Sequence, residues 1–257
     1  MATVISTLSD GIRTITFNRP EVHNAFDDEM GDRMLEAFRE ARDCKETRVV
    51  ILRGEGKSFL AGRDVRAMGE RPPGVTHFQF MTHGQQSIRA LIDIEAPIIA
   101  AVKGAALGGG AEVAMVADIR VGTPSVKFAL PEIDFGLCVD QGGSALAMSL
   151  IGPSKTKYLM LTGDRVKADQ ALEWGMLDFL VEEEELDAKV MEIAQKIAAK
   201  SWTAVLAAKG LVNELWRDEM RAAMRRELTQ QLALYGSEEF EQLREARRAA
   251  RAAKESA

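Results

Sequence analysis

Hydrophobic and polar positions in the N-terminal half follow the patterns of β-strands, with helical patterns between them. Thr3–Ile5 and Thr14–Phe17 predict two strands of one hairpin, which turns at Ser9-Asp10-Gly11. The short apolar runs Val49–Leu52 and Pro97–Val102 are each closed by a glycine and predict buried strands. We therefore expect a sheet whose inner strands are covered on both faces.

A helix is predicted between Asp27 and Asp43, where apolar side chains recur every three or four residues. Asp27 is placed to cap its first turn. A second helix is expected to open at Gly108-Gly109-Gly110 and to run through Ala117. Between the buried strands, Met68–His83 holds several glycines and prolines, so we expect a mobile loop there.

Strand patterns return at Asp118–Val121 and at Val126–Phe128, but the C-terminal part has none. Ala204–Ala253 is rich in Ala, Arg and Glu and predicts two or three amphipathic helices. The sequence thus predicts an α/β core over residues 1–198 and a helical C-terminal region over residues 199–257.

The composition is that of an ordinary globular protein, with 257 residues of which 46% are apolar and 28% charged. Cys44 and Cys138 cannot build a disulfide framework, which favours the reducing cytoplasm. The three histidines share no metal-ligand spacing, so no metal is expected. The N-terminus lacks the pattern of a signal peptide, and no apolar stretch reaches the ~18 residues of a membrane span.

The formal charge of −6 argues against sequence-independent binding of nucleic acid. The arginine-rich residues 221–257 are a local exception that suggests a nucleic-acid or membrane surface. That segment holds eight basic and six acidic residues, and their signs are interleaved. Interleaved charges are typical of a solvated or inter-subunit helix face, which is the interpretation we favour.

Two glycine-containing segments are candidates for binding chemistry. In Ser58–Asp64, which follows a predicted strand, a glycine turn can direct backbone N–H groups into a cleft. In Gly104–Glu112, three glycines stand at a helix start, where unpaired N–H groups favour an anion or a developing oxyanion. The alternatives are structural: a plain turn in the first segment and tight helix packing in the second.

Three acids are candidates for proton transfer. Glu112 and Glu132 have apolar neighbours in the sequence, and carboxyl groups in apolar surroundings tend to have raised pKa values that suit acid–base catalysis. Twenty residues separate them, so they cannot share a helix but can meet across a cleft. Asp140 is a third candidate, with the alternative that it caps a helix starting near Gly142. For any one acid alone, a surface or capping role is the alternative.

Together these segments resemble the crotonase family, also called the enoyl-CoA hydratase/isomerase superfamily, over nearly the whole chain. The motifs that carry the resemblance are Thr16-Phe17-Asn18-Arg19-Pro20, Asn24-Ala25-Phe26, Phe59-Leu60-Ala61-Gly62-Arg63-Asp64, Gly108-Gly109-Gly110-Ala111-Glu112, Leu130-Pro131-Glu132, Gly142-Gly143 and Leu161-Thr162-Gly163-Asp164-Arg165. The resemblance implies an α/β fold built as a spiral of ββα turns, with C-terminal helices that form a homotrimer or a homohexamer.

The resemblance also implies an enoyl-CoA hydratase-type lyase that adds water across the 2,3 double bond of an acyl-CoA. By position, the backbone N–H groups of Arg63 and Gly109 would hold the oxyanion, and Glu112 and Glu132 would be the acid–base pair. Coenzyme A enters only as part of the substrate, and no other cofactor is implied. The other residues implied in substrate binding are Ala25, Leu60, Ala61, Gly62, Asp64, Val65, Met68, Leu107, Gly108, Pro131 and Phe135.

Two departures from the family pattern keep alternatives open. Asp140 stands where hydratases of the family tend to carry a small neutral residue, while some isomerases and hydrolases use an acid there. A double-bond isomerase or hydrolase using Asp140 is therefore an alternative, and a non-catalytic RNA-binding protein of the same fold is another. Leu243–Ala257 also replaces the family's short basic segment that contacts the CoA phosphates; Lys57, Arg63 and Arg66 are possible substitutes.

The acyl pocket is expected to be lined by the loop that follows Met68 and by Phe135. Phe78, Phe80 and Met81 suit an apolar or aromatic acyl group, and the alternative is that they belong to the ordinary core.

Overall fold

The predicted hairpin forms one edge of a six-stranded sheet. The structure, a computed structural model, describes residues 2–255. Strand β1 (Val4–Ser9) pairs antiparallel with β2 (Ile12–Phe17), which confirms the hairpin. Asp10 and Gly11 adopt φ values of 51° and 77°, and this left-handed backbone makes the tight turn between the strands.

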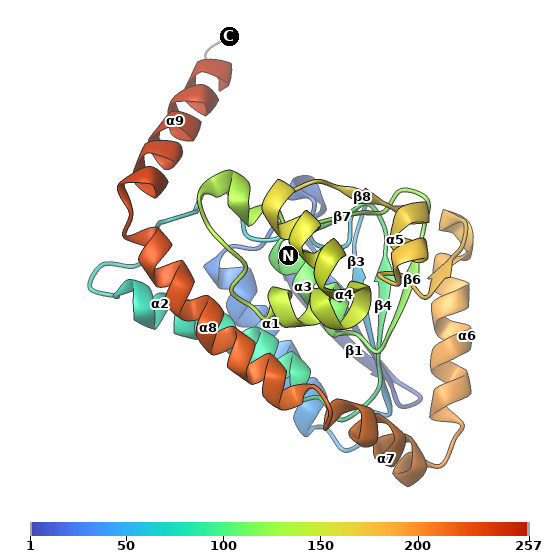
Figure 1. Cartoon of the computed structure of the whole chain (residues 1–257). Coiled ribbons are helices and arrows are strands. Elements are labelled where there is room, and N and C mark those ends of the chain that lie inside the picture. Colours follow the sequence, from blue (N-terminus) through green and yellow to red (C-terminus); the bar gives the residue numbers. More distant parts are fainter. Residues whose placement is uncertain (1, 256–257) are drawn as a thin grey trace.

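The other strands of this sheet run parallel to β2, in the order β1-β2-β3-β4-β6-β9. They are β3 (Val49–Gly54), β4 (Ile98–Val102), β6 (Ile119–Gly122) and β9 (Phe179–Leu180). Helices cover both faces of the sheet, with α6 (Leu186–Ala198) on one side and α1 (Asp28–Asp43) among those on the other (Figure 1). Burial on both faces explains why β3 and β4 are apolar almost throughout.

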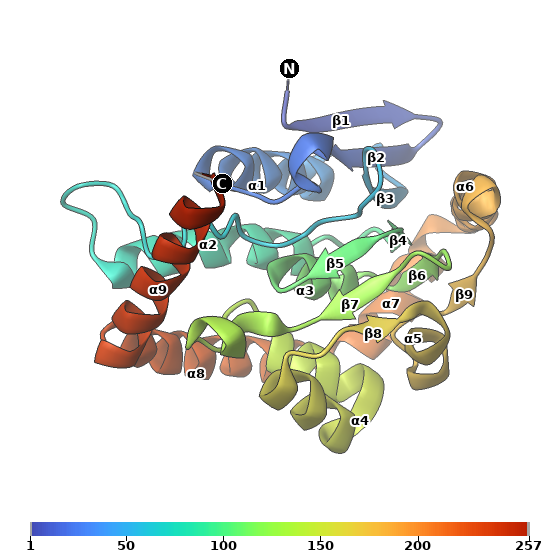
Figure 2. The same cartoon turned by 90° about the horizontal axis from the view of Figure 1, so that it is seen from above.

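A second, three-stranded sheet lies beside the first, in the order β5-β7-β8 (Figure 2). Its strands are β5 (Ala105–Leu107), β7 (Lys127–Ala129) and β8 (Val166–Lys167). The predicted strands at residues 118–121 and 126–128 are confirmed as β6 and β7. Strand β5 leads directly into helix α3 (Gly109–Val116), which starts at the glycine triplet as predicted.

The first predicted helix is confirmed as α1, and the Asp27 carboxylate accepts a hydrogen bond from the Met30 N–H at 3.0 Å. The prediction of a loop over residues 68–83 is wrong at its C-terminal end, because helix α2 (His77–Ile92) begins there. Thr76 and Gln79 form a capping box, in which each side chain bonds the other residue's backbone. This Thr-x-x-Gln signature was present in the sequence and outweighs the nearby glycines and prolines.

Three helices end the chain, as the periodicity predicted: α7 (Trp202–Asn213), α8 (Arg217–Tyr235) and α9 (Glu238–Glu255). Helix α8 packs against α2 and α4, and α9 extends from its end past the rest of the chain (Figures 1 and 2). The remaining helices are α4 (Gly143–Thr162), α5 (Ala168–Trp174) and the 3-10 turns η1 (Pro20–Val22), η2 (Pro131–Phe135) and η3 (Glu183–Glu185). Over residues 2–255, no helix is long and apolar enough to cross a membrane.

Candidate active site

The two glycine-containing segments meet side by side. The Leu60 N–H donates to the Ala105 carbonyl at 3.0 Å, and the Leu107 N–H donates to the Leu60 carbonyl at 3.1 Å. Two glycines make this approach possible. A Cβ on Gly110 would lie 1.9 Å from the Leu60 oxygen, and one on Gly62, whose φ is +84°, would lie 2.4 Å from the Leu107 oxygen.

This junction leaves two backbone N–H groups free beside each other. The bridge between Phe26 and Arg63 uses the Gly62 carbonyl and the Asp64 N–H, so the Arg63 N–H has no partner among the described residues. The Gly109 N–H, at the first position of α3, likewise has none within residues 2–255. Two fixed, unpaired donors of this kind can hold a developing negative charge.

The acids lie around the same junction. Glu132 is in η2, and its carboxyl group lies against Gly108. A Cβ on Gly108 would lie 2.9 Å from a Glu132 carboxyl oxygen. Burial raises the pKa of Glu132 to about 8, and the charge of Asp140 acts in the same direction. Burial also raises the pKa of Asp140 to about 7, while the Arg63 guanidinium opposes the increase. These carboxyl groups are therefore able to exchange protons near neutral pH.

Glu112 is more deeply placed, in α3, with 1% of its surface exposed. Burial raises the pKa of Glu112 well above its ordinary value, and the charges of Glu132 and Asp140 add to the effect. Its Oε1 accepts hydrogen bonds from the N–H groups of Gln141, at 3.0 Å, and of Gly143, at 2.8 Å. Oε2 of Glu112 and Oε2 of Glu132 are buried with no hydrogen bond to any described residue, so each carboxyl group retains an oxygen for proton transfer.

The start of α4 is capped by two carboxylates from other helices. Besides the two N–H groups on Glu112, the Gly142 N–H donates to Glu227 Oε2 at 2.6 Å, and the Ser144 N–H donates to Glu227 Oε1 at 2.9 Å. The helix begins near Gly142 as predicted, but the alternative that Asp140 caps it is wrong, because these donors are all occupied by the two glutamates. Asp140 instead lines the cavity described next.

A cavity of about 660 Å³ opens over the free N–H groups and over Glu132 and Asp140. The predicted site residues that line it are Ala61, Gly62, Arg63, Val65, Met68, Leu107, Gly108, Gly109, Pro131, Glu132, Phe135 and Asp140. Phe80 and Met81 line it too, whereas Phe78 does not and is 56% exposed. The cavity also has a polar wall, where Arg63 pairs with Asp28 at 2.8 Å.

Four predicted residues do not line this cavity: Ala25, Leu60, Asp64 and Glu112. Leu60 is fully buried and joins the two turns through its backbone, as described above. The Asp64 carboxylate is turned onto its own loop, where it accepts bonds from the Arg66 N–H at 3.0 Å and from Nε at 2.9 Å. Roles in substrate binding for these residues stay predictions.

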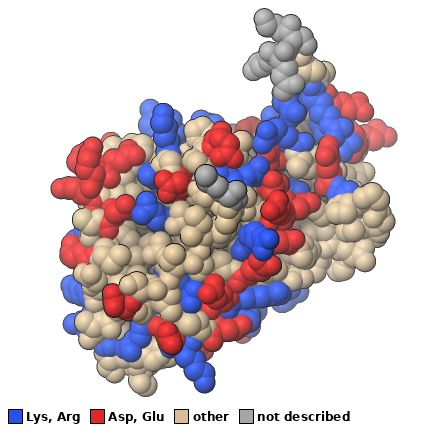
Figure 3. Space-filling view, turned by 180° about the vertical axis from the view of Figure 1, so that it is seen from behind, with Lys and Arg blue, Asp and Glu red and all other residues tan. Residues whose placement is uncertain are grey.

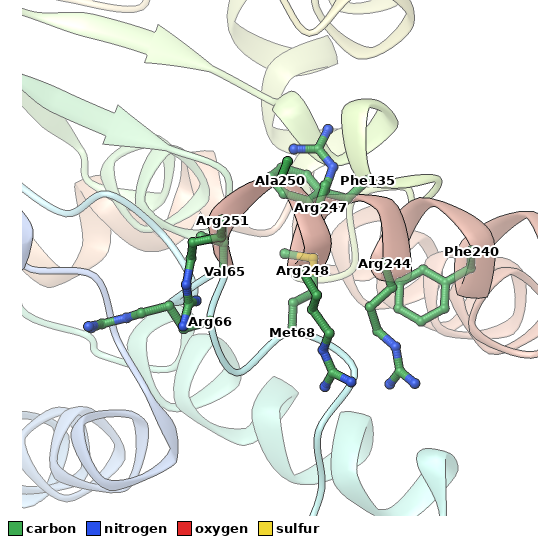
Figure 4. A pocket seen from close by; sticks show the side chains of 10 residues that line it. All are labelled: Val65, Arg66, Met68, Phe135, Phe240, Arg244, Arg247, Arg248, Ala250 and Arg251. Carbon is green, nitrogen blue, oxygen red and sulfur yellow. The ribbon is translucent and has the colours of Figure 1, made fainter. Parts of the chain in front are cut away.

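A smaller cavity of about 300 Å³ adjoins the first and is rich in arginine. Val65, Met68, Phe135 and Arg247 line both cavities. The arginines of the smaller one are Arg66 and, from α9, Arg244, Arg247, Arg248 and Arg251 (Figure 4). Basic side chains gather with acidic ones over α9 on the outer surface (Figure 3). The α9 arginines thus line a cavity, in addition to forming the charged helix face predicted from the sequence.

We call this set of five the arginine groove. The three candidate phosphate-binding residues named from the sequence lie in different places. Arg66 belongs to the groove, Arg63 lies in the larger cavity, and Lys57 lines neither. The groove arginines are braced by carboxylates of the same chain, such as Glu70, which pairs with Arg248 at 2.7 Å.

Sequence reasoning missed the contribution of α8. Glu227 is 6% exposed and sits on the buried face of that helix, together with Met220, Met224 and Gln231. The Gln231 Oε1 accepts the Cys138 N–H at 3.0 Å, two residues before Asp140. The signal was available, because an acid that falls on the apolar stripe of an amphipathic helix is expected to be buried with a partner.

Comparison with known proteins fixes the family. The model of the enoyl-CoA hydratase/isomerase family matches residues 7–250. The chain belongs to this family. A short-chain-enoyl-CoA hydratase of Clostridium acetobutylicum is 36% identical over 203 residues, which is 79% of this chain and 77% of that protein. A carnitinyl-CoA dehydratase of Salmonella enteritidis is 37% identical over 201 residues, 77% of this chain and 75% of that protein.

The crotonase fold implied by the motifs is likewise confirmed. A crystal structure of an enoyl-CoA hydratase/isomerase from Xanthobacter autotrophicus Py2 matches with a TM-score of 0.87 and 30% identity, covering 96% of this chain and 93% of that one. The two sheets and the C-terminal helices of this chain are those of crotonases. Within residues 2–255, no group of three or more His, Cys, Asp or Glu is arranged to hold a metal ion.

Family membership makes an acyl-CoA enzyme of the hydratase or dehydratase type the general conclusion. The relatives differ in the acyl group that their names give, so the family alone does not specify the reaction. The specific reaction is therefore inferred from the arrangement of the acids.

Proposed function

We propose that this crotonase is an enoyl-CoA hydratase, which adds water across the 2,3 double bond of an acyl-CoA thioester. The observation that supports it best is the junction itself: two unpaired N–H groups, of Arg63 and Gly109, stand beside Glu132, with Glu112 behind. The thioester oxygen gains negative charge as the double bond reacts. Fixed donors stabilise that charge more than the neutral ground state, and losing one donor typically costs ~10²–10³ in rate.

The two glutamates divide the proton transfers. Glu112 is the base that takes a proton from water: its Oε1 accepts two N–H bonds, and that of Gln141 opposes the increase in pKa that burial and the neighbouring acids cause. The hydroxyl then bonds to C3, and the electron pair of the double bond moves onto the thioester as an enolate. Glu132, whose pKa of about 8 keeps it protonated at neutral pH, gives its proton to C2.

Coenzyme A would place its phosphates in the arginine groove. The groove adjoins the larger cavity, and Arg247 borders both. Arginine is well suited to phosphate because its planar guanidinium presents several donors in a fixed fork. In this chain α9 would therefore replace the short basic segment found at the C-terminus of many relatives.

A second candidate keeps support from one observation. Asp140 lines the cavity, has a pKa of about 7 and is not the cap of α4. An acid in that position is able to move a proton between carbons, as a double-bond isomerase requires, or to assist hydrolysis. Crotonyl-CoA tests hydration, which gives one product heavier by one water, and hydrolysis, which releases free CoA; a 3-enoyl-CoA tests isomerisation.

Purified protein should therefore be incubated with each of these two thioesters, and the products separated by liquid chromatography and identified by mass and by the ultraviolet absorbance that distinguishes a 2-enoyl from a 3-enoyl thioester. Hydration predicts a mass gain of one water from crotonyl-CoA. Conversion of the 3-enoyl-CoA to its 2-enoyl isomer, with crotonyl-CoA left intact, would replace the hydratase by the Asp140 isomerase.

A further inference from the structure

The segment Cys138–Ser144, which we call the acid loop, is held in place by side chains of two helices that are distant from it in the sequence. Glu112 of α3 accepts the N–H groups of Gln141 and Gly143, and Glu227 of α8 accepts those of Gly142 and Ser144. Four consecutive N–H groups thus alternate between two carboxylates. The Ser144 hydroxyl adds a further bond to Glu227.

We propose that Glu227 is a positioning residue of the active site, which fixes the acid loop so that Glu112 and Asp140 stand in their working positions. This role rests on the proposed hydratase function. Glu227 touches neither substrate cavity and acts only through the backbone of the acid loop.

The alternation makes the two carboxylates depend on each other. The Gly142 and Ser144 N–H groups are fixed by Glu227, so the intervening Gly143 N–H can point only toward Glu112. Without Glu227, two buried donors would lose their partner and the start of α4 would shift. Glu112 would then lose its two bonds, and with them the backbone contact that opposes the increase in its pKa and so helps it to act as a base.

Both oxygens of Glu227 receive a backbone N–H, which requires them to act as acceptors and favours a carboxylate. That negative charge faces the titratable groups of every element packed around the acid loop. They are Glu112 of α3, Glu132 of η2, and Cys138 and Asp140 of the loop itself; Arg63 opposes the increase in the pKa of Asp140, and Tyr235 of α8 lies within the influence of both Asp140 and Arg63. The charge of Glu227 raises the pKa of each of these carboxyl groups and of the Cys138 thiol.

A helix start needs only one short polar cap, which an exposed Ser or Asp commonly supplies. Here a long acid from residue 227 is buried close to three other acids, an arrangement whose mutual repulsion and desolvation are costly. The buried position of Glu227 is explained if the acid loop must be rigid and if Asp140 and the nearby Glu132 must hold their protons near neutral pH. The C-terminal helix α8 is then part of the site.

The test compares Glu227→Gln with Glu219→Gln, the same substitution at a position of α8 that is 78% exposed. We expect Glu227→Gln to lower kcat for crotonyl-CoA about 10- to 100-fold, with KM changed by less than about threefold. The alkaline limb of its pH profile should move to lower pH by roughly one unit, because the loss of the charge lowers the pKa of Glu132. Glu219→Gln should match the wild type, and a folded Glu227→Gln with wild-type kcat and pH profile would overturn the proposal.

Two further measurements keep the outcome decisive. If Glu227→Gln does not fold, Glu227→Asp retains the charge but is one methylene short of its two donors; it should lose kcat and keep the wild-type alkaline limb. Wild-type kcat in Glu227→Asp would contradict the positioning role.

If the wild type does not hydrate crotonyl-CoA, the proposed function fails but the role of Glu227 is still measurable. Carboxyl-carbon NMR of protein labelled with 13C-glutamate gives the titration of Glu132, assigned by its loss in Glu132→Gln. A Glu132 titration that is the same in the wild type and Glu227→Gln would refute the inference without any use of turnover.

Discussion

Glu132 lines the cavity, and one of its buried carboxyl oxygens has no hydrogen-bond partner among residues 2–255. Replacement by glutamine keeps the shape of the side chain and removes its proton. We expect Glu132→Gln to lower the hydration rate by about 10²–10⁴ and to leave product binding within about twofold. Steady-state kinetics and calorimetric titration with 3-hydroxybutyryl-CoA would measure both, and a variant that turns over at the wild-type rate removes Glu132 from the mechanism.

The pH dependence of the wild type follows from the same residue. Glu132 acts as an acid only while protonated, so kcat should fall as the pH rises through its pKa of about 8. Asp140→Ala removes a neighbouring negative charge, which lowers the pKa of Glu132, and the fall should therefore begin at lower pH. An Asp140→Ala variant that is folded but slower by several orders of magnitude at every pH would make Asp140 the reacting acid.

For single residues, the sequence was more informative about those that face the cavity than about those that hold the cavity residues in place. Gly109 and Glu132 were recognisable because they belong to motifs with fixed spacing, and Asp140 because it departs from the family pattern. The apolar stripe of α8 indicates that Glu227 is buried, but its partners are backbone N–H groups 83 and 85 residues away, so no local pattern identifies them. The folding of α8 against α4 creates this contact.

At the scale of elements, the contact between the two turns depends on Gly110. A methyl group there would overlap the Leu60 carbonyl, so Gly110→Ala must push the turns apart. We expect a loss of about 1–3 kcal/mol in the free energy of unfolding, together with loss of the activity that hydrates the acyl-CoA. Gly210→Ala, in α7 with open space around it, is the matched control and should raise stability by about 0.5–1 kcal/mol. Equal stabilities in urea unfolding would contradict the close contact.

Helix α9 carries a separate prediction about binding. Replacing Arg248 and Arg251 together by glutamine should raise KM for an acyl-CoA about tenfold, equivalent to about 1.4 kcal/mol, with little change in kcat. The increase should shrink at high salt, because contacts between exposed charges are screened. Arg226→Gln on the exposed side of α8 is the control. An unchanged KM in the double variant would remove the phosphates from the groove.

Elements were predicted well where the pattern is strong and local. Strands β3 and β4 and helix α1 follow from buried apolar runs and a capping aspartate, whereas β9, with two residues, was not predicted. The start of α2 was hidden by the glycines and prolines before it. The arginine groove was hidden by interleaved charges, since its shape arises only when α9 packs beside η2 and the loop at Met68.

At the scale of the whole molecule, we propose that the chain forms trimers or hexamers, as the resemblance to crotonases implied. Apolar side chains are exposed at the end of α7 and just beyond, with Leu211 at 69% and Leu215 at 83%. Such a patch favours association. Light scattering should give three or six times the chain mass of 28.2 kDa, and a monomer at micromolar concentration would contradict this expectation.

The most direct test of the account is the ultraviolet absorbance of crotonyl-CoA mixed with the wild type and, in parallel, with Glu132→Gln. The account predicts that the wild type removes the conjugated enoyl-thioester band and forms 3-hydroxybutyryl-CoA, while Glu132→Gln leaves the band almost unchanged. A wild type that leaves the band intact, or a variant that removes it equally fast, would contradict hydration by the glutamate pair.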